Sequence, residues 1–167
     1  MNTSTSALFE PLTLPNGRVI PNRLCKAAME ENLSDEGQIP GKRLYRLYQS
    51  WAEGGVGLVL TGNVMVAPDA MTGPGGVVLQ QDTNLASFKQ WAKVGKPEDG
   101  HIWMQINHPG RQVYAAMGET ALSPSNKALD MGSFSNMFAQ PRGMTEQEIE
   151  TLIQRFVATS KQAEAAG

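Results

Sequence analysis

Short apolar runs alternate with amphipathic segments along this chain of 167 residues. The apolar runs cover residues 24–29, 56–61 and 101–106, and the second is flanked by glycines. Short apolar runs of this kind are typical of parallel strands that are buried on both faces. They therefore predict three strands, and the amphipathic segments between them predict the helices of βα units with right-handed crossovers.

Apolar residues at spacings of three and four predict two helices between these strands. The first follows Pro40 and ends at Gly54-Gly55, since glycine commonly terminates helices. Its apolar positions are Leu44, Leu47, Tyr48 and Trp51. The second begins near residues 82–84, and its apolar positions are Leu85, Phe88, Trp91 and Ala92.

A third helix has the clearest start signal. Thr145 and Glu148 form the pattern of a capping box, in which each side chain bonds an otherwise unpaired backbone N–H group. One apolar stripe then follows, made of Ile149, Leu152, Ile153, Phe156 and Val157. Residues 107–140 show no strong period, and a loop of that length is expected to be functional or poorly ordered.

Composition and charge narrow the class of protein. A hydrophobic content of 41% predicts one core and a single domain over residues 1–167. The net charge of −2 argues against nucleic acid as a partner, and no apolar run reaches the ~20 residues of a membrane span. Residues 1–6 lack the order of a secretory signal. The single Cys25 excludes an internal disulfide and a cysteine-rich metal site, so we expect a cytoplasmic protein without a metal centre.

The stretch 104–111 is the most informative for function. It reads as a strand that breaks into a polar loop, and in barrels of parallel strands the chemistry is assembled at such carboxyl ends. Gln105 is an amide within an apolar run and is costly to bury without partners. An amide offers a donor and an acceptor together, which suits the polar edge of a heterocycle such as a flavin. Alternatively, Gln105 bonds a neighbouring loop.

Together with Leu8-Phe9-Glu10-Pro11-Leu12 and Pro21-Asn22-Arg23-Leu24, this stretch resembles the Old Yellow Enzyme family of FMN-dependent ene-reductases. The resemblance runs from about Leu8 to Gly167. Three βα units alone predict a small open α/β sheet, since a closed eight-stranded barrel needs ~250 residues. The resemblance instead implies the amino-terminal half of a (β/α)8 TIM barrel. We expect the chain to be a fragment, because the family's next strand does not follow Gly167.

The resemblance also implies a set of cofactor-binding residues. The segment 27–30 lies against the flavin ring in related enzymes, where small residues let the backbone approach a flat ligand. The implied flavin contacts are Ala27, Ala28, Met29, Glu30, Asn63 and Gln105. The residues alone leave other roles open: an ordinary strand end at 27–30 and a turn residue at Asn63, following the second strand.

Three positions depart from the family pattern. Ala28 stands where proline is common, and Glu30 stands where Thr or Cys often tunes the flavin. An ionised Glu30 beside reduced flavin would lower its potential. Asn32 stands where a substrate-facing tyrosine is common, so a substrate contact is expected there on position alone. Glu30 and Glu31 are expected to point to opposite faces, because they are adjacent in an extended segment.

No catalytic residue is assigned within this chain. The family's paired histidine or asparagine and its phosphate site belong to later strands, and residues 73–76 lack the spacing of a phosphate loop. His108 is expected to bond loop backbone, with closure of the site mouth, together with Arg111, as the alternative. His101 is expected to be structural.

The implied activity is reduction of activated alkenes, such as enones and enals, by NADH or NADPH through FMN. Two alternatives come from the small number of βα units. The chain could be a non-catalytic half-barrel that pairs with a second copy or another subunit, because an uncovered apolar face favours association. It could also be a flavin-binding module without turnover.

Overall fold

The computed structural model describes residues 7–167, so the polar segment 1–6 lies outside the described residues. The strands are β1 (Leu12–Thr13), β2 (Val19–Ile20), β3 (Cys25–Lys26), β4 (Leu58–Met65), β5 (Val77–Val78), β6 (His101–Asn107), β7 (Ala121–Ser123) and β8 (Pro141–Gly143). The helices are α1 (Lys42–Glu53), α2 (Ala86–Gly95) and α3 (Glu146–Ala166), with 3₁₀ turns η1 (Ala7–Phe9), η2 (Ala115–Met117) and η3 (Gly132–Met137).

The long strand β4 is the centre of a parallel sheet. It pairs with β6 along one edge, and with β3 and then β5 along the other. The three predicted strands are confirmed, with different bounds. The first is shorter than the run 24–29, and the second extends to Met65, so Asn63 lies within the strand rather than after it.

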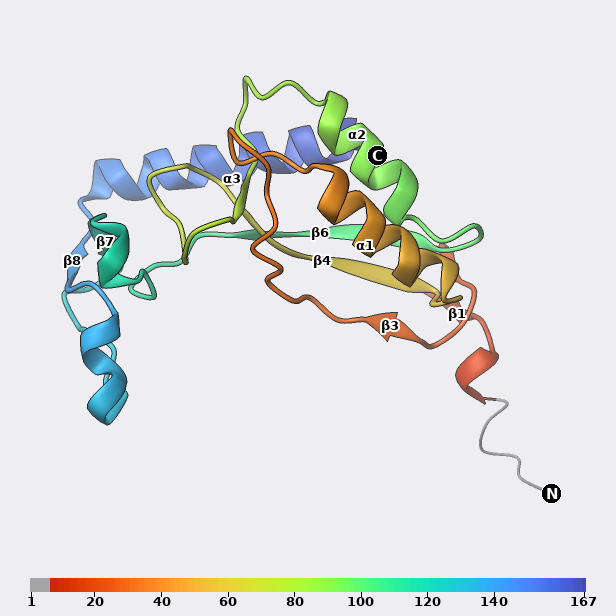
Figure 1. Cartoon of the computed structure of the whole chain (residues 1–167), viewed down its shortest axis with the longest axis horizontal. Coiled ribbons are helices and arrows are strands. Elements are labelled where there is room, and N and C mark those ends of the chain that lie inside the picture. Colours follow the sequence, from red (N-terminus) through yellow and green to blue (C-terminus); the bar gives the residue numbers. More distant parts are fainter. Residues whose placement is uncertain (1–6) are drawn as a thin grey trace.

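All three α-helices lie on the same side of this sheet (Figure 1). The core between helices and sheet is apolar and includes side chains from β4, α1 and α2. Its buried members are Leu44, Tyr48, Val59, Val64, Val77, Leu79, Phe88, Trp91 and Ala166. On β6, Ile102 and Met104 pack against this core, while Trp103 and Gln105 alternate with them and are exposed on the opposite, open face.

The predicted helices α1 and α2 are confirmed, and they pack through aromatic rings. Leu44 and Tyr48 are the buried residues of α1, and Phe88 and Trp91 are buried on α2. The Tyr48 and Trp91 rings meet edge to face with centroids 4.9 Å apart, a favoured arrangement of aromatic pairs. Gly55 follows α1 with φ of +80°, a left-handed conformation that glycine adopts without strain.

The capping box of α3 is also confirmed. The Glu148 amide donates to Thr145 Oγ1 at 3.2 Å, and the Thr145 amide donates to Glu148 Oε2 at 2.8 Å. The apolar stripe, however, is not the buried face of the helix. Exposed fractions reach 49% at Ile153, whereas α3 buries the small residues Thr159 and Ala166 against the rest of the protein.

We expect the start of α3 to weaken in acid. Arg142, which bonds the Glu148 carboxylate, and the Thr145 amide lower the pKa of Glu148 to about 2. A carboxylate with a depressed folded pKa contributes stability above its unfolded pKa, and this contribution is lost as pH falls toward about 2. A carboxyl titration by NMR should give that low midpoint for Glu148 and a loss of helical shifts at residues 146–149 in parallel. A midpoint near the ordinary glutamate value would contradict this account, and exposed Glu150 is the control.

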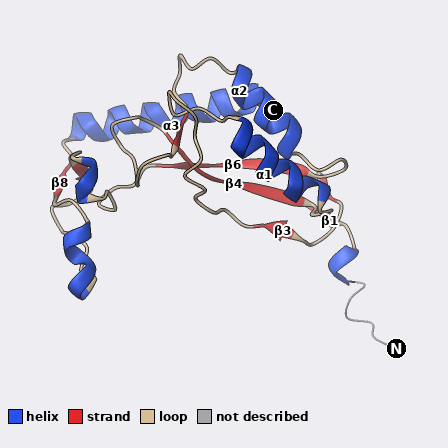
Figure 2. Cartoon of the chain, viewed as in Figure 1, coloured by secondary structure: helices blue, strands red, loops and turns tan. Residues whose placement is uncertain are grey.

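Residues 107–140 carry more structure than their sequence indicates. They contain η2, β7 and η3, and β7 pairs in parallel with β8. Figure 2 shows these short elements and the intervening loops beyond the carboxyl ends of β4 and β6. We call residues 107–140 the excursion. The Tyr114 and Phe138 rings stack with centroids 5.4 Å apart, and this contact holds the first and last parts of the excursion together. The excursion therefore lies beside the end of the sheet where a site is expected.

None of the described helices combines the length and the apolar character that a membrane crossing requires.

Candidate functional site

Gln105 and Asn63 lie side by side near the carboxyl ends of β6 and β4. They are register partners in the parallel pairing, so their side chains share one face of the sheet. The register shifts between Leu60 and Asn63, which places one extra residue in β4. Thr61 compensates for this bulge, because its Oγ1 accepts the Gln105 amide at 2.9 Å. The bulge thus directs Asn63 to the open face beside Gln105.

The Gln105 side chain is exposed and makes no hydrogen bond to residues 7–167. The predicted alternative, a bond to a neighbouring loop, is therefore not found within the described chain. Trp103 lies two residues earlier on the same face and is 43% exposed. The open face therefore presents the apolar indole of Trp103 followed by the polar amide of Gln105.

The segment 27–30 lies directly against β4 at Gly62. A Cβ atom on Gly62 would overlap the Met29 carbonyl oxygen and the Glu31 carboxylate. Glycine at this position therefore permits the close approach of the two backbones. Ala27 and Met29 are exposed on the open side, and Ala28 is partly buried. The small side chains at 27 and 28 leave their backbone accessible.

Glu30 and Glu31 point in different directions, as expected for neighbouring extended residues. Glu30 is exposed, and its Oε1 accepts a hydrogen bond from Thr72 Oγ1. The carboxylate of Glu30 is thus held at the rim of the open face by the loop after β4. Glu31 turns inward, beneath α1.

Sequence reasoning missed a buried polar network that includes Glu31. Lys26 Nζ lies 3.2 Å from Glu31 Oε1 and donates to the Leu60 carbonyl at 2.9 Å. The Tyr48 hydroxyl donates to Glu31 Oε1 and accepts the Gly62 amide, both at 2.7 Å. The signal available in the sequence was alternation: Lys26 has the parity that turns away from Ala27, toward the helices.

Burial shifts the titration of this network. It lowers the pKa of the Lys26 ammonium, and the Glu31 carboxylate offsets part of that change. Burial and the hydrogen bond to Glu31 hold the pKa of the Tyr48 phenol well above its ordinary value. The Tyr48 hydroxyl therefore keeps its proton at all physiological pH values and remains the donor to Glu31.

Asn32 lies just beyond the network. It is exposed and has a φ of +55°, a left-handed conformation in which asparagine is enriched. The Ser34 amide donates to the Gly75 carbonyl at 3.0 Å, which ties this turn to the loop after β4. The Asn32 carbonyl also lies next to Gly75, so Asn32 is placed against the loop that follows β4.

The two histidines have backbone partners, as predicted. His108 Nδ1 accepts the Gly110 amide at 3.1 Å, and burial together with Arg155 lowers the pKa of His108. His101 starts β6, with Nε2 3.0 Å from the Val19 carbonyl oxygen. Arg111 donates to the Lys127 carbonyl at 3.2 Å and so braces the excursion rather than the open face.

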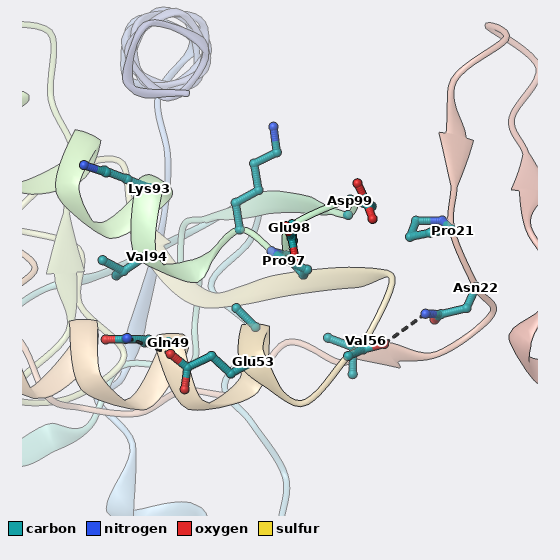
Figure 3. A pocket seen from close by; sticks show the side chains of 14 residues that line it. Pro21, Asn22, Gln49, Glu53, Val56, Lys93, Val94, Pro97, Glu98 and Asp99 are labelled. Carbon is teal, nitrogen blue, oxygen red and sulfur yellow. Dashed lines mark hydrogen bonds between the residues drawn. The ribbon is translucent and has the colours of Figure 1, made fainter.

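A cavity lies at the opposite end of the sheet, where the strands begin. Its volume is about 680 Å³, and it is lined by segments that precede β3, β4 and β6 and by the ends of α1 and α2. Figure 3 shows side chains of both signs there, including Lys93 and Glu98. The Asn22 amide crosses to the Gly55 carbonyl at 2.9 Å (dashed in Figure 3). In barrels of this kind the amino-terminal end serves stability, so we assign no chemistry to this cavity.

The residues on the open face fit the edge of a flavin better than a metal ion. Among residues 7–167, no group of three or more His, Cys, Asp or Glu side chains is arranged to hold a metal. A free amide with one donor group and one acceptor oxygen, beside accessible backbone at 27–30, matches a planar ring that carries both donors and acceptors.

Comparison with known proteins gives the family context. A model of the NADH:flavin oxidoreductase / NADH oxidase family matches residues 7–167. The NADH-dependent flavin oxidoreductase iliE of Hypocrea jecorina (strain QM6a) is 34% identical over 173 residues, which cover 94% of this chain and 43% of the relative. The NADH oxidase of Thermoanaerobacter brockii is 35% identical over 149 residues, which cover 89% of this chain and 22% of the relative. The chain thus spans less than half the length of these relatives.

Solved structures agree on the fold. Morphinone reductase superposes with a TM-score of 0.82 and 21% identity, over 96% of this chain and 46% of its own. An Old Yellow Enzyme homologue from Zymomonas mobilis gives 0.80 and 19%, over 96% and 46%. The parallel sheet is therefore part of a (β/α)8 barrel, as predicted, and its open face corresponds to the barrel interior.

Proposed function

Because the chain belongs to the NADH:flavin oxidoreductase / NADH oxidase family, we propose that it forms part of an FMN-dependent enzyme that reduces activated C=C bonds with NADH or NADPH. The observation that carries the proposal is the placement of Asn63 and Gln105 as register partners on the barrel face. This pair lies at the carboxyl ends of the strands, where barrel enzymes assemble their sites.

The chemistry that bound FMN supplies is transfer of a hydride from NADH or NADPH to the β-carbon of an enone or enal. Gln105 binds the pyrimidine edge of the ring, donating through its NH₂ group and accepting through its oxygen. Asn63 adds a hydrogen bond from the neighbouring strand. These two amides orient the ring, and their fixed dipoles favour charge that develops on its polar edge.

The segment 27–30 forms the floor of the proposed site. The exposed Ala27 and the partly buried Ala28 are small, so their backbone N–H groups reach the ring's polar atoms. Met29 covers apolar ring surface with its exposed thioether side chain. Asn32, exposed beside the loop that follows β4, is proposed to face the alkene substrate.

Two measurements test this function. Purified protein that contains this chain should carry or bind FMN, seen as the flavin absorbance band, and should prefer FMN to FAD. It should then oxidise NADH or NADPH in the presence of a cyclic enone. A protein that binds flavin and oxidises NADH but reduces no enone or enal would remain in the family and lose the proposed substrate class.

Glu30→Gln should raise the FMN midpoint potential by tens of millivolts. An ionised carboxylate ~4 Å from the ring would oppose the added negative charge by ~1–4 kcal/mol, and ~30 mV corresponds to 1.4 kcal/mol for a two-electron couple. Thr72 Oγ1 donates to one oxygen of Glu30, and the second oxygen has no bond to it, so the sign of the shift in the Gln variant distinguishes an ionised carboxylate from a protonated donor. Spectroelectrochemical titration between pH 6 and 8 makes the comparison.

Glu36→Gln is the matched control for this measurement, because Glu36 is exposed on the same connecting loop. A lower potential in the Glu30 variant would mean that the protonated side chain donates to the ring. An unchanged potential would mean that Glu30 points away from it.

A second candidate role is association through the open face, with a second copy as the partner. Two large apolar side chains are exposed on this face, Met29 and Trp103. Exposed apolar surface of this extent favours association. Light scattering after gel filtration would give a multiple of 18.1 kDa if copies pair, and a single 18.1 kDa species would remove this role.

The only cysteine, Cys25, is free and exposed, which supports a reducing, cytoplasmic setting.

A further inference from the structure

A buried ion pair brackets the segment that forms the proposed flavin floor. Lys26 ends β3, and Glu31 follows it after four residues. Both side chains turn to the helix side of the sheet, where they are 6% and 10% exposed, and Nζ lies 3.2 Å from Oε1. Of the intervening residues, Ala27, Met29 and Glu30 are exposed, and Ala28 is partly buried. The pair thus joins the two ends of this short segment on the helix side of the sheet.

The same pair is tied to β4 and to α1. Lys26 Nζ donates to the Leu60 carbonyl at 2.9 Å and lies 4.2 Å from the centre of the Trp51 ring. The Tyr48 hydroxyl joins Glu31 to the Gly62 amide, with both distances 2.7 Å. Gly62 is also the residue on which the Met29 carbonyl rests. The base of the loop and the strand beneath it are therefore fixed by one network.

Stability alone is a poor reason for this arrangement. Removing two charges from water is expensive, and well-packed neutral side chains in place of a buried pair are often as stable or more so. Tyr48 already packs on Trp51 and Trp91 with ring centroids 5.0 and 4.9 Å away. The ion pair contributes a defined geometry, because its directional hydrogen bonds fix the positions of Lys26 and Glu31 at the two ends of the segment 27–30.

We propose that Lys26 and Glu31, with Tyr48, are positioning residues that hold the backbone of residues 27–30 in the conformation that binds the flavin ring. This inference rests on the proposed FMN function. It assigns a role to three side chains that do not touch the ring and lie on the opposite side of the sheet from it.

The test is the double variant Lys26→Met/Glu31→Gln. Both replacements keep the length of the side chain, and removing both charges leaves neither one buried alone. We expect a melting temperature close to that of the parent protein. We also expect the FMN Kd to rise roughly tenfold, the loss of about one good interaction. In flavin-free protein, NMR order parameters at residues 27–30 should fall from about 0.85 to below about 0.6.

The matched control is Arg43→Met/Asp35→Asn. That ion pair is 62% and 46% exposed with 4.0 Å between Nη2 and Oδ1, so its loss should change neither the FMN Kd nor the order parameters. Tyr48→Phe removes only the hydroxyl between Glu31 and Gly62. Its FMN Kd and its order parameters at residues 27–30 are measured in the same way, and this variant tests the proposal if the double variant does not fold.

Each result decides the proposal. Increased mobility at 27–30 together with weaker FMN binding supports it. Unchanged order parameters overturn it, and so does increased mobility with an unchanged Kd. If the parent protein binds no FMN, the proposed function fails, and the order parameters alone then decide whether the pair positions the loop.

Discussion

Gly62→Ala is expected to destabilise the protein and to weaken flavin binding together. The added Cβ overlaps the Met29 carbonyl oxygen and the Glu31 carboxylate, and neither can move freely. Met29 is backbone at this contact, and Glu31 is held by Lys26 and Tyr48. Overpacking of this kind costs about 1–3 kcal/mol. In a chain of this size that corresponds to a fall in melting temperature of roughly 2–12 °C.

The measurement is thermal unfolding followed by FMN titration. Gly54→Ala is the control, since its Cβ would come no closer than 3.2 Å to a neighbouring atom, the Trp51 carbonyl oxygen, and its φ of −70° suits alanine. Equal stability and equal FMN affinity in the Gly62 variant would show that the 27–31 segment moves away from β4 without cost. The close approach of the two backbones at Gly62 would then matter neither for stability nor for FMN binding.

The helices could be predicted because their signals are local. The capping box at Thr145 and Glu148 involves residues three apart, and the apolar positions of α1 repeat once per turn. The strand carrying Gln105 was also predicted, because its apolar run is short and only Gln105 interrupts it between Ile102 and Ile106. These features depend on neighbouring residues alone, so the rest of the fold does not alter them.

The buried face of α3 could not be predicted in the same way. Its most apolar stripe includes Ile149 and Ile153, yet the helix packs through Thr159, whose Oγ1 donates to the Leu79 carbonyl at 2.7 Å. Small residues allow a helix to lie close to its neighbours, and a satisfied hydroxyl can be buried at little cost. Which side of a helix faces the sheet is set by the crossover and by contacts distant in sequence.

The positions of Asn63 and Lys26 needed the three-dimensional structure for different reasons. Asn63 was expected after the second strand, but a one-residue bulge and the Thr61 hydroxyl extend β4 through it. Lys26 was read as part of an apolar run, although charged side chains are rarely buried without partners. Its partner Glu31 lies in the following loop, and the helix that covers both begins eleven residues after that carboxylate.

Gln105→Leu is expected to weaken FMN binding by about 1–3 kcal/mol, roughly 5- to 150-fold in Kd. Leucine nearly matches glutamine in size and removes both the donor and the acceptor. The backbone bond from the residue 105 amide to Thr61 Oγ1 remains, so β6 keeps its pairing with β4. Because the Gln105 side chain is exposed, its loss should change the free energy of unfolding by less than about 0.5 kcal/mol.

This separation of binding from stability makes the variant informative. Fluorescence quenching of FMN gives the Kd, and a redox titration of the same sample gives the potential. Gln112→Leu is the control, because Gln112 is an exposed glutamine in the loop that follows β6. If both Kd and potential of the Gln105 variant equal those of the control, the amide does not meet the ring. The polar edge of the flavin would then have to lie toward Asn63, which shares the same face and register, and Asn63→Leu would become the variant that weakens binding.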